Sequence, residues 1–363
     1  MFDKLKNLKK TTKVDFATYI GVTIAFVVML LLKNGGGLSR SVSGMLIPIC
    51  CYIVMAISLN LTVGILGELS LGHAGFMSVG AFSGIIVAMG LRDAVPSVTL
   101  RLIIAMVVGA LFAALAGVIV GIPVLRLKGD YLAIVTLAFG EIIKEIMNCL
   151  VVGKDSRGLH IAFNVSGKVT IDSLGLDESG YAIIKGAQGA TGTDKIATFT
   201  AGFILIMLSL IIILNLVRSH AGRAILAIRD NRIAAESVGI NVTKYKMMAF
   251  VISASLAGAA GALYGLNYSN LAAAKFDFNA SILVLVFVVL GGLGNIWGSV
   301  IAATVLYVLP EALRSFADYR MLVYAAILIF VMLATNSDKV KLLTSKLLDK
   351  KKKKTAKGDA VNE

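Results

Sequence analysis

The chain has 363 residues, of which 58% are hydrophobic and 15% charged, and its net charge is +14. Soluble proteins contain about 25% charged residues, and a chain with a mean hydropathy of +0.87 would leave large apolar patches in water. The composition therefore excludes an ordinary soluble domain and indicates a membrane protein, whose excess of Lys and Arg belongs in cytoplasmic loops and needs no nucleic-acid partner.

Apolar runs predict an all-α polytopic membrane protein with about ten transmembrane helices, because a bilayer core about 30 Å thick needs roughly 20 apolar residues per helix. One run, 131–152, is apolar apart from Glu141, Lys144 and Glu145, which share a helical face. Another, 278–310, is too long for one helix, and the cluster Gly291–Asn295 divides it into two short spans. The remaining runs are 16–32, 41–67, 69–91, 102–125, 196–217, 247–274 and 321–337.

Charge predicts that both chain ends are cytoplasmic. An odd number of spans would put the run Lys350–Lys354 outside, against the tendency of basic residues to stay inside. We therefore expect a basic cytoplasmic amino-terminal segment (1–15), a membrane domain (16–337) and a basic cytoplasmic tail (338–363) that meets anionic lipid. Within the membrane domain, 153–195 forms an external loop and 218–246 a cytoplasmic loop. The external loop contains strand-like stretches at 168–171 and 181–184, and its role as a docking or lid element or as a plain surface loop stays open.

The segment Asn60–Phe76 is unusual for a membrane span because it holds four glycines, one acid and one histidine. Irregular backbone at membrane depth is tolerated where it lines a cavity or is buried in protein. In one interpretation Glu68 lies at the cytoplasmic interface of a two-span hairpin and His73 packs against a neighbouring carbonyl. In the other, a broken helix offers backbone N–H groups near the midplane to a carboxylate in transit. The candidate translocation path is then Asn60, Thr62, Glu68, Gly72, His73 and Phe76.

Small residues recur at every fourth position in three spans, a spacing that lets helix backbones approach closely. This pattern predicts a tight bundle or a helix interface. The residues are Ser253, Ala257, Gly261 and Gly265, then Ala113, Gly117 and Gly121, and finally Gly80 and Gly84.

The cytoplasmic loop contains an amphipathic segment. Residues 223–238 have the composition of a short helix, and Gly239 is a natural carboxy-terminal stop. Such a helix lies on lipid headgroups or docks into a protein groove. Because Asp230 and Glu236 accompany its basic residues, we expect docking to protein.

No pattern for catalysis or nucleotide binding is present, since the three histidines are far apart and no Walker A motif occurs. The three cysteines lie in or beside apolar runs without metal-binding spacing. We therefore expect a non-enzymatic chain without catalytic residues, metal or cofactor. An ion-coupled carrier that uses Glu68 and Glu141 as ion sites is an alternative.

Three blocks of this sequence resemble the permease subunits of branched-chain amino acid ABC transporters, and the likeness extends over nearly the whole chain. The middle block is similar to the M-type subunit, whose partner is an H-type permease. The blocks are Leu59–Phe76, Pro123–Glu141, and Gly222–Gly239 followed by 246–261 and Val289–Gly298.

The resemblance implies a multi-pass subunit of an ATP-driven importer of Leu, Ile and Val in a bacterial plasma (inner) membrane. An extracytoplasmic amino-acid-binding protein would deliver the substrate to a heterodimer with the H-type permease, and two cytoplasmic ATPases would bind ATP and Mg. Importers of urea and short-chain amides have similar permeases and are an alternative. The resemblance also places a coupling segment at the ATPase, with the residues Gly222, Arg223, Arg229, Asp230, Ala234, Ala235, Glu236 and Gly239.

Overall fold

The computed structural model describes residues 10–37, 39–127, 129–155, 157–164, 177 and 180–313, with scattered positions between 319 and 329. Several predicted features lie outside these residues: the lysines before residue 10, the strand-like stretch 168–171, the tail from 338 and most of the expected span 321–337. The chain divides into two compact units, Met1–Thr304 and Val305–Glu363, and the candidate site lies within the first.

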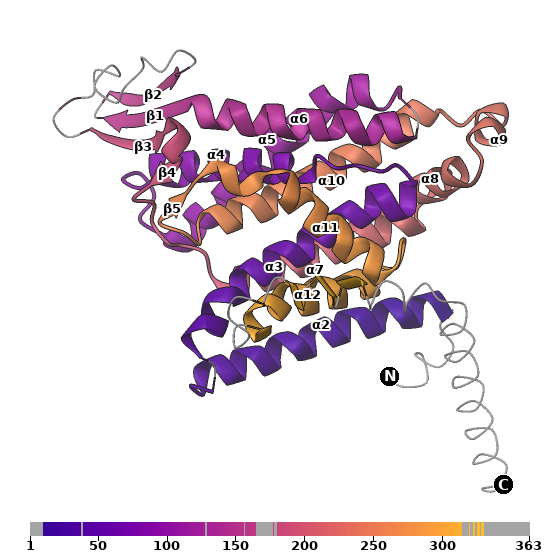
Figure 1. Ribbon diagram of the computed structural model, residues 1–363, viewed down its shortest axis with the longest axis horizontal. Coiled ribbons are helices and arrows are strands. Elements are labelled where there is room, and N and C mark those ends of the chain that lie inside the picture. The colour runs from indigo at the N-terminus through magenta and orange to yellow at the C-terminus, as the bar shows by residue number, and fades with distance from the viewer. Residues whose placement is uncertain are drawn as a thin grey trace, which may run out of the picture. The chain divides into compact units, whose positions relative to one another are not determined.

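Each expected span up to residue 310 contains a helix in the described part of the chain (Figure 1). Five helical stretches are long and apolar enough to cross a membrane: Ser41–Leu66, His73–Gly90, Val98–Val124, Phe199–Arg218 and Val242–Gly265. The structure thus has the helices of a polytopic membrane protein, while the count of ten spans stays a prediction. The long helices are α2 (Lys10–Asn34), α3 (Arg40–Asn60), α4 (His73–Gly90), α5 (Val98–Val124), α6 (Asp130–Cys149), α7 (Phe199–Arg218), α10 (Val242–Gly265), α11 (Phe278–Gly291) and α12 (Ile296–Ala312).

Helices α4, α5 and α10 pack closely through small residues, among them Gly80, Ala113 and Gly261 of the predicted series and also Gly258, which lies outside it. A Cβ on Gly80 of α4 would lie 2.1 Å from the carbonyl oxygen of Gly258 in α10. A Cβ on Gly258 would lie 2.3 Å from the Cβ of Ala113 in α5, and one on Gly261 would lie 2.0 Å from the carbonyl oxygen of Met77 in α4. The predicted close helix interface is confirmed, and it joins three helices.

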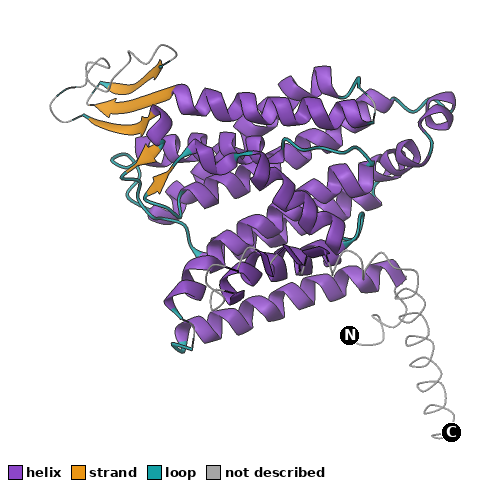
Figure 2. Ribbon diagram, viewed as in Figure 1, coloured by secondary structure: helices purple, strands orange, loops and turns teal. Residues whose placement is uncertain are grey.

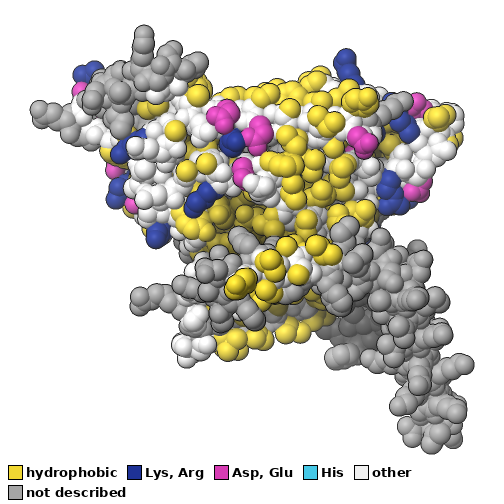
Figure 3. All heavy atoms as spheres, viewed as in Figure 1, with side chains coloured by type: hydrophobic (Ala, Val, Ile, Leu, Met, Phe, Trp, Pro, Cys, Tyr) yellow, Lys and Arg dark blue, Asp and Glu magenta, His cyan; other side chains and the backbone are white. Residues whose placement is uncertain are grey.

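Large apolar side chains cover the outer face of α5 instead. Leu111 and Ile119 are 62% and 61% exposed, whereas Ala113 on the opposite face is fully buried. Figure 3 shows apolar side chains spread across the middle of the visible surface, with many Lys and Arg residues toward its two ends. Exposed apolar area on this scale suits a lipid environment.

A five-stranded antiparallel sheet corrects the expectation of an all-α fold (Figure 2). Strand β1 begins directly after α6, where Leu150–Val152 favour extended backbone, so the helix expected to reach residue 152 ends at Cys149. Strand β3 confirms the strand expected at 181–184. The order is β2 (Gly158–Phe163), β1 (Leu150–Asp155), β3 (Tyr181–Lys185), β4 (Ala190–Thr191) and β5 (Asn270–Leu271), and Ala190 lies opposite Leu271.

The turn between β1 and β2 is built around Asp155, whose side chain is buried. The carboxylate accepts backbone N–H groups from Arg157 at 2.8 Å and Gly158 at 3.0 Å, and His160 Nε2 lies 3.0 Å away. Burial by itself raises the pKa of Asp155, but these donors outweigh it and hold the pKa below 3.8. The hairpin is therefore stabilised by an ionised carboxylate.

Candidate functional site

The helix that begins with α3 breaks within the unusual segment Asn60–Phe76. It continues as a buried π-helix, Leu61–Leu66, and ends at Gly67, whose φ of +81° favours glycine. The N–H groups of Gly67 and Glu68 both donate to the carbonyl of Thr62. Residues 67–72 are irregular and α4 begins at His73, so the predicted break is confirmed.

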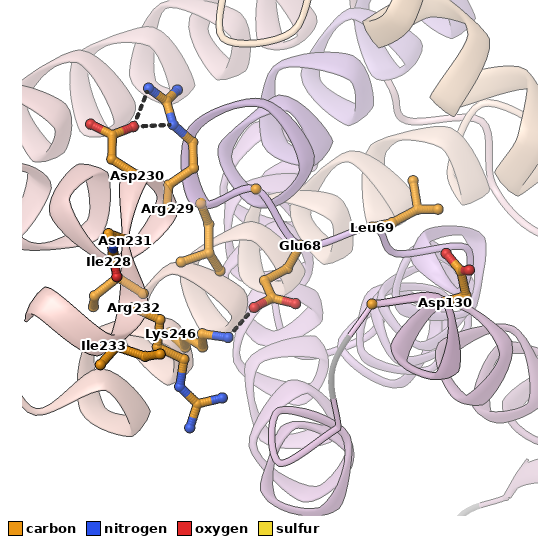
Figure 4. A pocket seen from close by; sticks show the side chains of 13 residues that line it. Glu68, Leu69, Asp130, Ile228, Arg229, Asp230, Asn231, Arg232, Ile233 and Lys246 are labelled. Carbon is orange, nitrogen blue, oxygen red and sulfur yellow. Dashed lines mark hydrogen bonds and ion pairs between the residues drawn. The ribbon is translucent and has the colours of Figure 1, made fainter. Parts of the chain in front are cut away.

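The break lies beside residues 218–246, the predicted cytoplasmic loop with the coupling segment, which is called the coupling loop below (Figure 4). Glu68 forms an ion pair with Lys246 near the start of α10, and Arg229 in the coupling loop donates to the carbonyl oxygen of Gly64 at 3.3 Å. Glu68 therefore lies beside the segment 218–246, and its place at the cytoplasmic interface stays a prediction.

The other path candidates make contacts inside the chain. Asn60 is fully buried; its Nδ2 donates to Ser299 Oγ at 2.9 Å and its Oδ1 accepts the N–H of Gly294 at 2.8 Å. His73 Nε2 lies 2.8 Å from Ser58 Oγ, so its partner is a hydroxyl and not the expected carbonyl. Asn60 thereby joins the break after α3 to the glycine turn between α11 and α12.

The remaining candidates, Thr62, Gly72 and Phe76, also contact other residues of the chain. Thr62 Oγ1 donates to the carbonyl of Leu59 at 2.9 Å. The ring of Phe76 meets those of His73 and Phe250 edge to face, and a Cβ on Gly72 would lie 2.1 Å from the carbonyl oxygen of Thr136. These contacts pack the broken segment against its neighbours.

Two backbone N–H groups in the broken segment are already bonded to hydroxyls. The N–H of Leu71 donates to Thr136 Oγ1 at 3.0 Å, and the N–H of Ala74 donates to Ser281 Oγ at 3.1 Å. In this conformation both donors serve helix packing, so a carboxylate in transit would have to displace a hydroxyl to reach them.

The coupling loop forms two short helices where the sequence predicted one. Helix α8 (His220–Asp230) ends at Asn231, whose side chain accepts the N–H of Ala234 at 3.1 Å and so caps α9 (Arg232–Ser237). The stop predicted at Gly239 is confirmed, because its φ is +84° and its N–H donates to the carbonyl of Glu236. The N–H of Ile240 donates to the carbonyl of Ala235, which completes a Schellman motif.

The two short helices bury one face and expose the other. On the inner face, Gly222 is buried in α8, and Ala235 packs with Ile228 and Val242. The outer face includes Ile233 and Val238, which are 79% and 75% exposed. In a single continuous helix these two would lie about 140° apart and would not share one apolar stripe. The cap at Asn231 is the signal that could have separated α9 from α8. The predicted coupling residues Arg223, Asp230, Ala234, Glu236 and Gly239 are exposed as well.

A pocket of about 550 Å³ lies between the break and the coupling loop (Figure 4). It is lined by side chains of both signs, so its electrostatic character is mixed. Of the six path candidates, only Glu68 lines it. The charged lining residues are Glu68, Asp130, Arg229, Asp230, Arg232 and Lys246.

Comparisons with known proteins agree with this arrangement. The family model described as "Branched-chain amino acid transport system / permease component" matches residues 41–332. The high-affinity branched-chain amino acid transport system permease protein LivM of Escherichia coli (strain K12) is 34% identical over 292 residues, which cover 78% of this chain and 66% of that protein. This chain therefore spans slightly less than two thirds of that relative's length.

Two further relatives are more distant. The permease protein LivH of Salmonella typhimurium is 28% identical over 78% of this chain and 88% of its own length. The fructose import permease protein FruG of Bifidobacterium longum is 24% identical over 91% and 95%. No solved structure matches. The extent of the family match shows that this chain belongs to the family of branched-chain amino acid transport system permease components.

Proposed function

We propose that the chain is a transmembrane permease subunit of an ATP-driven importer for Leu, Ile and Val in the plasma (inner) membrane of a bacterium. The observation that carries the proposal is the coupling loop, which presents an exposed apolar pair on one face and contacts the broken helix with the other. Family membership supports the importer, and the names of LivM and LivH support the substrate class.

The proposed assembly contains a second, H-type permease as heterodimer partner, two cytoplasmic ATPases and an extracytoplasmic amino-acid-binding protein. ATP and Mg are bound by the ATPases, so this chain contributes no cofactor of its own. This chain is similar to both LivM and LivH. Such similarity is expected if two related permeases form one membrane unit.

The outer face of α9, together with the capping residue Val238 that follows it, is the proposed ATPase contact. Ile233 and Val238 supply exposed apolar anchors, and Glu236 lies between them in sequence with its carboxylate about half exposed. Apolar anchors surrounded by polar groups are the usual composition of a docking site. Closure of the ATPase pair on ATP then moves α8 and α9 and shifts the bundle between outward and inward openings.

Uptake of radiolabelled leucine into membrane vesicles that contain the whole complex tests the transport reaction. We expect uptake to require ATP and the binding protein, and to be competed by isoleucine and valine. Loss of uptake on adding a proton uncoupler without ATP depletion would indicate an ion-coupled carrier instead. Competition by urea, acetamide or fructose and not by valine would reassign the substrate.

Ile233→Asp, Val238→Asp and Glu236→Lys test the docking face. Each is expected to leave the chain inserted but to lower the amount of ATPase that co-purifies with it. Thr243→Asp is the matched control, because it adds a charge at another exposed position on the first turn of α10. Normal ATPase association in all three docking variants would refute this surface.

A further inference from the structure

The broken helix ends in carbonyl groups that need partners. Ser41–Leu66 is a continuous apolar helical stretch of 26 residues, and the last four carbonyls of a helix have no partner within it. The carbonyl of Thr62 is satisfied by the N–H groups of Gly67 and Glu68. The carbonyl of Gly64 accepts its hydrogen bond from Arg229, a residue of the coupling loop. A cation at this position also suits the negative end of the helix dipole.

The orientation of Arg229 is fixed by two neighbours. Asp230 Oδ1 accepts from its Nε at 3.2 Å and from its Nη2 at 3.1 Å, which leaves Nη1 for the carbonyl of Gly64. The aliphatic part lies against Gly67, where an added Cβ would come within 2.7 Å of Arg229 Cγ. The side chain therefore points into the break, although about 40% of its surface remains exposed.

A second contact ties the other end of the coupling loop to the same break. Lys246 is followed by the long part of α10, and its side chain is only 4% exposed. It pairs with Glu68, the residue directly after Gly67. Arg229 and Lys246 thus contact the break from two points of the coupling loop. Both line one pocket (Figure 4).

The break in turn rests on the glycine turn between α11 and α12. A Cβ on Gly64 would lie 1.9 Å from Asn60 Oδ1 and 2.2 Å from the backbone nitrogen of Gly294. Gly294 has a φ of +80° and donates its N–H to Asn60. Movement of the π-helix therefore displaces this turn too, because no gap separates the two backbones.

We propose that Arg229 is a positioning residue for transport, which carries movement of the coupling loop to the break between α3 and α4 and does not itself bind the ATPase. This proposal rests on the ATPase docking proposed above, and it reassigns the role expected for Arg229 from the sequence. The π-helix is a suitable receiver, since π-helical turns are rare and frequently lie at functional sites.

The test compares Arg229→Gln, Arg229→Lys and Glu236→Lys in the full transporter reconstituted in liposomes with leucine, its binding protein and ATP. Lys244→Gln is the matched control, because Lys244 is an exposed cation on the first turn of α10. The readouts are ATPase retained by the complex and leucine molecules imported per ATP hydrolysed.

For Arg229→Gln we expect full ATPase retention and an import ratio lower by about fivefold or more, the usual size of an intersite coupling. Arg229→Lys is expected to restore part of the ratio, because an ammonium still reaches the carbonyl of Gly64. Lys244→Gln should match the wild type. An unchanged import ratio in a fully assembled Arg229→Gln complex would overturn the proposal.

Loss of ATPase from Arg229→Gln, as expected for Glu236→Lys, would make Arg229 a docking contact and leave the proposed function intact. Retention of ATPase by Glu236→Lys and by the Ile233 and Val238 variants would instead refute the docking surface. If Arg229→Gln does not accumulate, Arg229→Lys decides: an import ratio below that of Lys244→Gln with ATPase retained supports the proposal, and an equal ratio overturns it.

Discussion

Replacing Asn60 with alanine should destabilise the chain, because this side chain joins the break after α3 to the glycine turn between α11 and α12. The substitution removes the hydrogen bonds to Ser299 and from Gly294. A buried hydrogen bond contributes about 1 kcal/mol net, and a buried group left without its partner costs about 1–3 kcal/mol. Ser299 is fully buried, but its hydroxyl still donates to the carbonyl of Asn295 at 3.2 Å, and the backbone of Gly294 is exposed to water. Neither group is left without a partner, so the expected loss is about 2 kcal/mol, about 1 kcal/mol for each hydrogen bond.

A thiol-reactive dye can follow unfolding of the purified chain in detergent, because Cys50 and Cys51 are buried in the same helix as Asn60. For Asn60→Ala we expect the midpoint to fall by roughly 3 °C, because an unfolding entropy of about 2.1 cal/mol/K per residue over 363 residues corresponds to about 1.3 °C per kcal/mol. Asn60→Asp should be no more stable than Asn60→Ala. Its carboxylate can still accept the N–H of Gly294, but the cost of burying a charge outweighs that hydrogen bond.

The control is Asn279→Ala, since Asn279 is exposed and bonds only Asp277 among the contacts resolved for its side chain. It should change the midpoint little, as exposed substitutions usually do. An Asn60→Ala midpoint equal to that of the wild type, or a drop of the same size in Asn279→Ala, would refute the reasoning that Asn60 joins the two elements.

The remaining predictions concern packing, charge and pH. Gly80→Val should prevent stable accumulation because α4 and α10 touch there, while Gly44→Ala, which meets nothing within 4 Å, should be tolerated; immunoblots of membranes distinguish the two, and equal levels would contradict the contact. Glu68→Gln or Lys246→Met alone should lower the thermal midpoint by leaving one buried charge unpaired, and the double variant should recover part of it; additive losses would argue against the pair. Since the folded pKa of Asp155 lies below 3.8, its contribution is complete above pH 3.8 and is lost as the pH falls through the folded value; hydrogen exchange at the β1–β2 turn should therefore show lower protection factors in acid, and Asp155→Asn should remove that dependence.

Local patterns in the sequence were enough to predict much of the helical framework. The break after Asn60, the close packing at Gly80 and Gly261 and the stop at Gly239 all depend on what glycine permits, namely a positive φ or a close backbone contact. These properties belong to single residues and their near neighbours. They can therefore be read without knowing the tertiary structure.

Contacts between distant segments could not be predicted in the same way. The partner of His73 is Ser58, and Arg229 meets Gly64, 165 residues away. The exposed position of Ile233 accompanies the interruption at Asn231, whose extended backbone ends α8 and whose side chain caps α9. The sheet was missed in part because β5 is only two residues long and is stabilised by pairing with β4.

Pairing between β4 and β5 sets an order for assembly during synthesis. Ala190 precedes α7 and its partner Leu271 follows α10, so two apolar helices and the coupling loop must emerge before the strands can meet. A ribosome delivers the chain from its amino terminus, and β4 therefore waits with an open edge until α10 has been inserted. Completion of this sheet thus reports that the central helices are in place, and a chain ending before Asn270 would leave this edge of β4 unpaired.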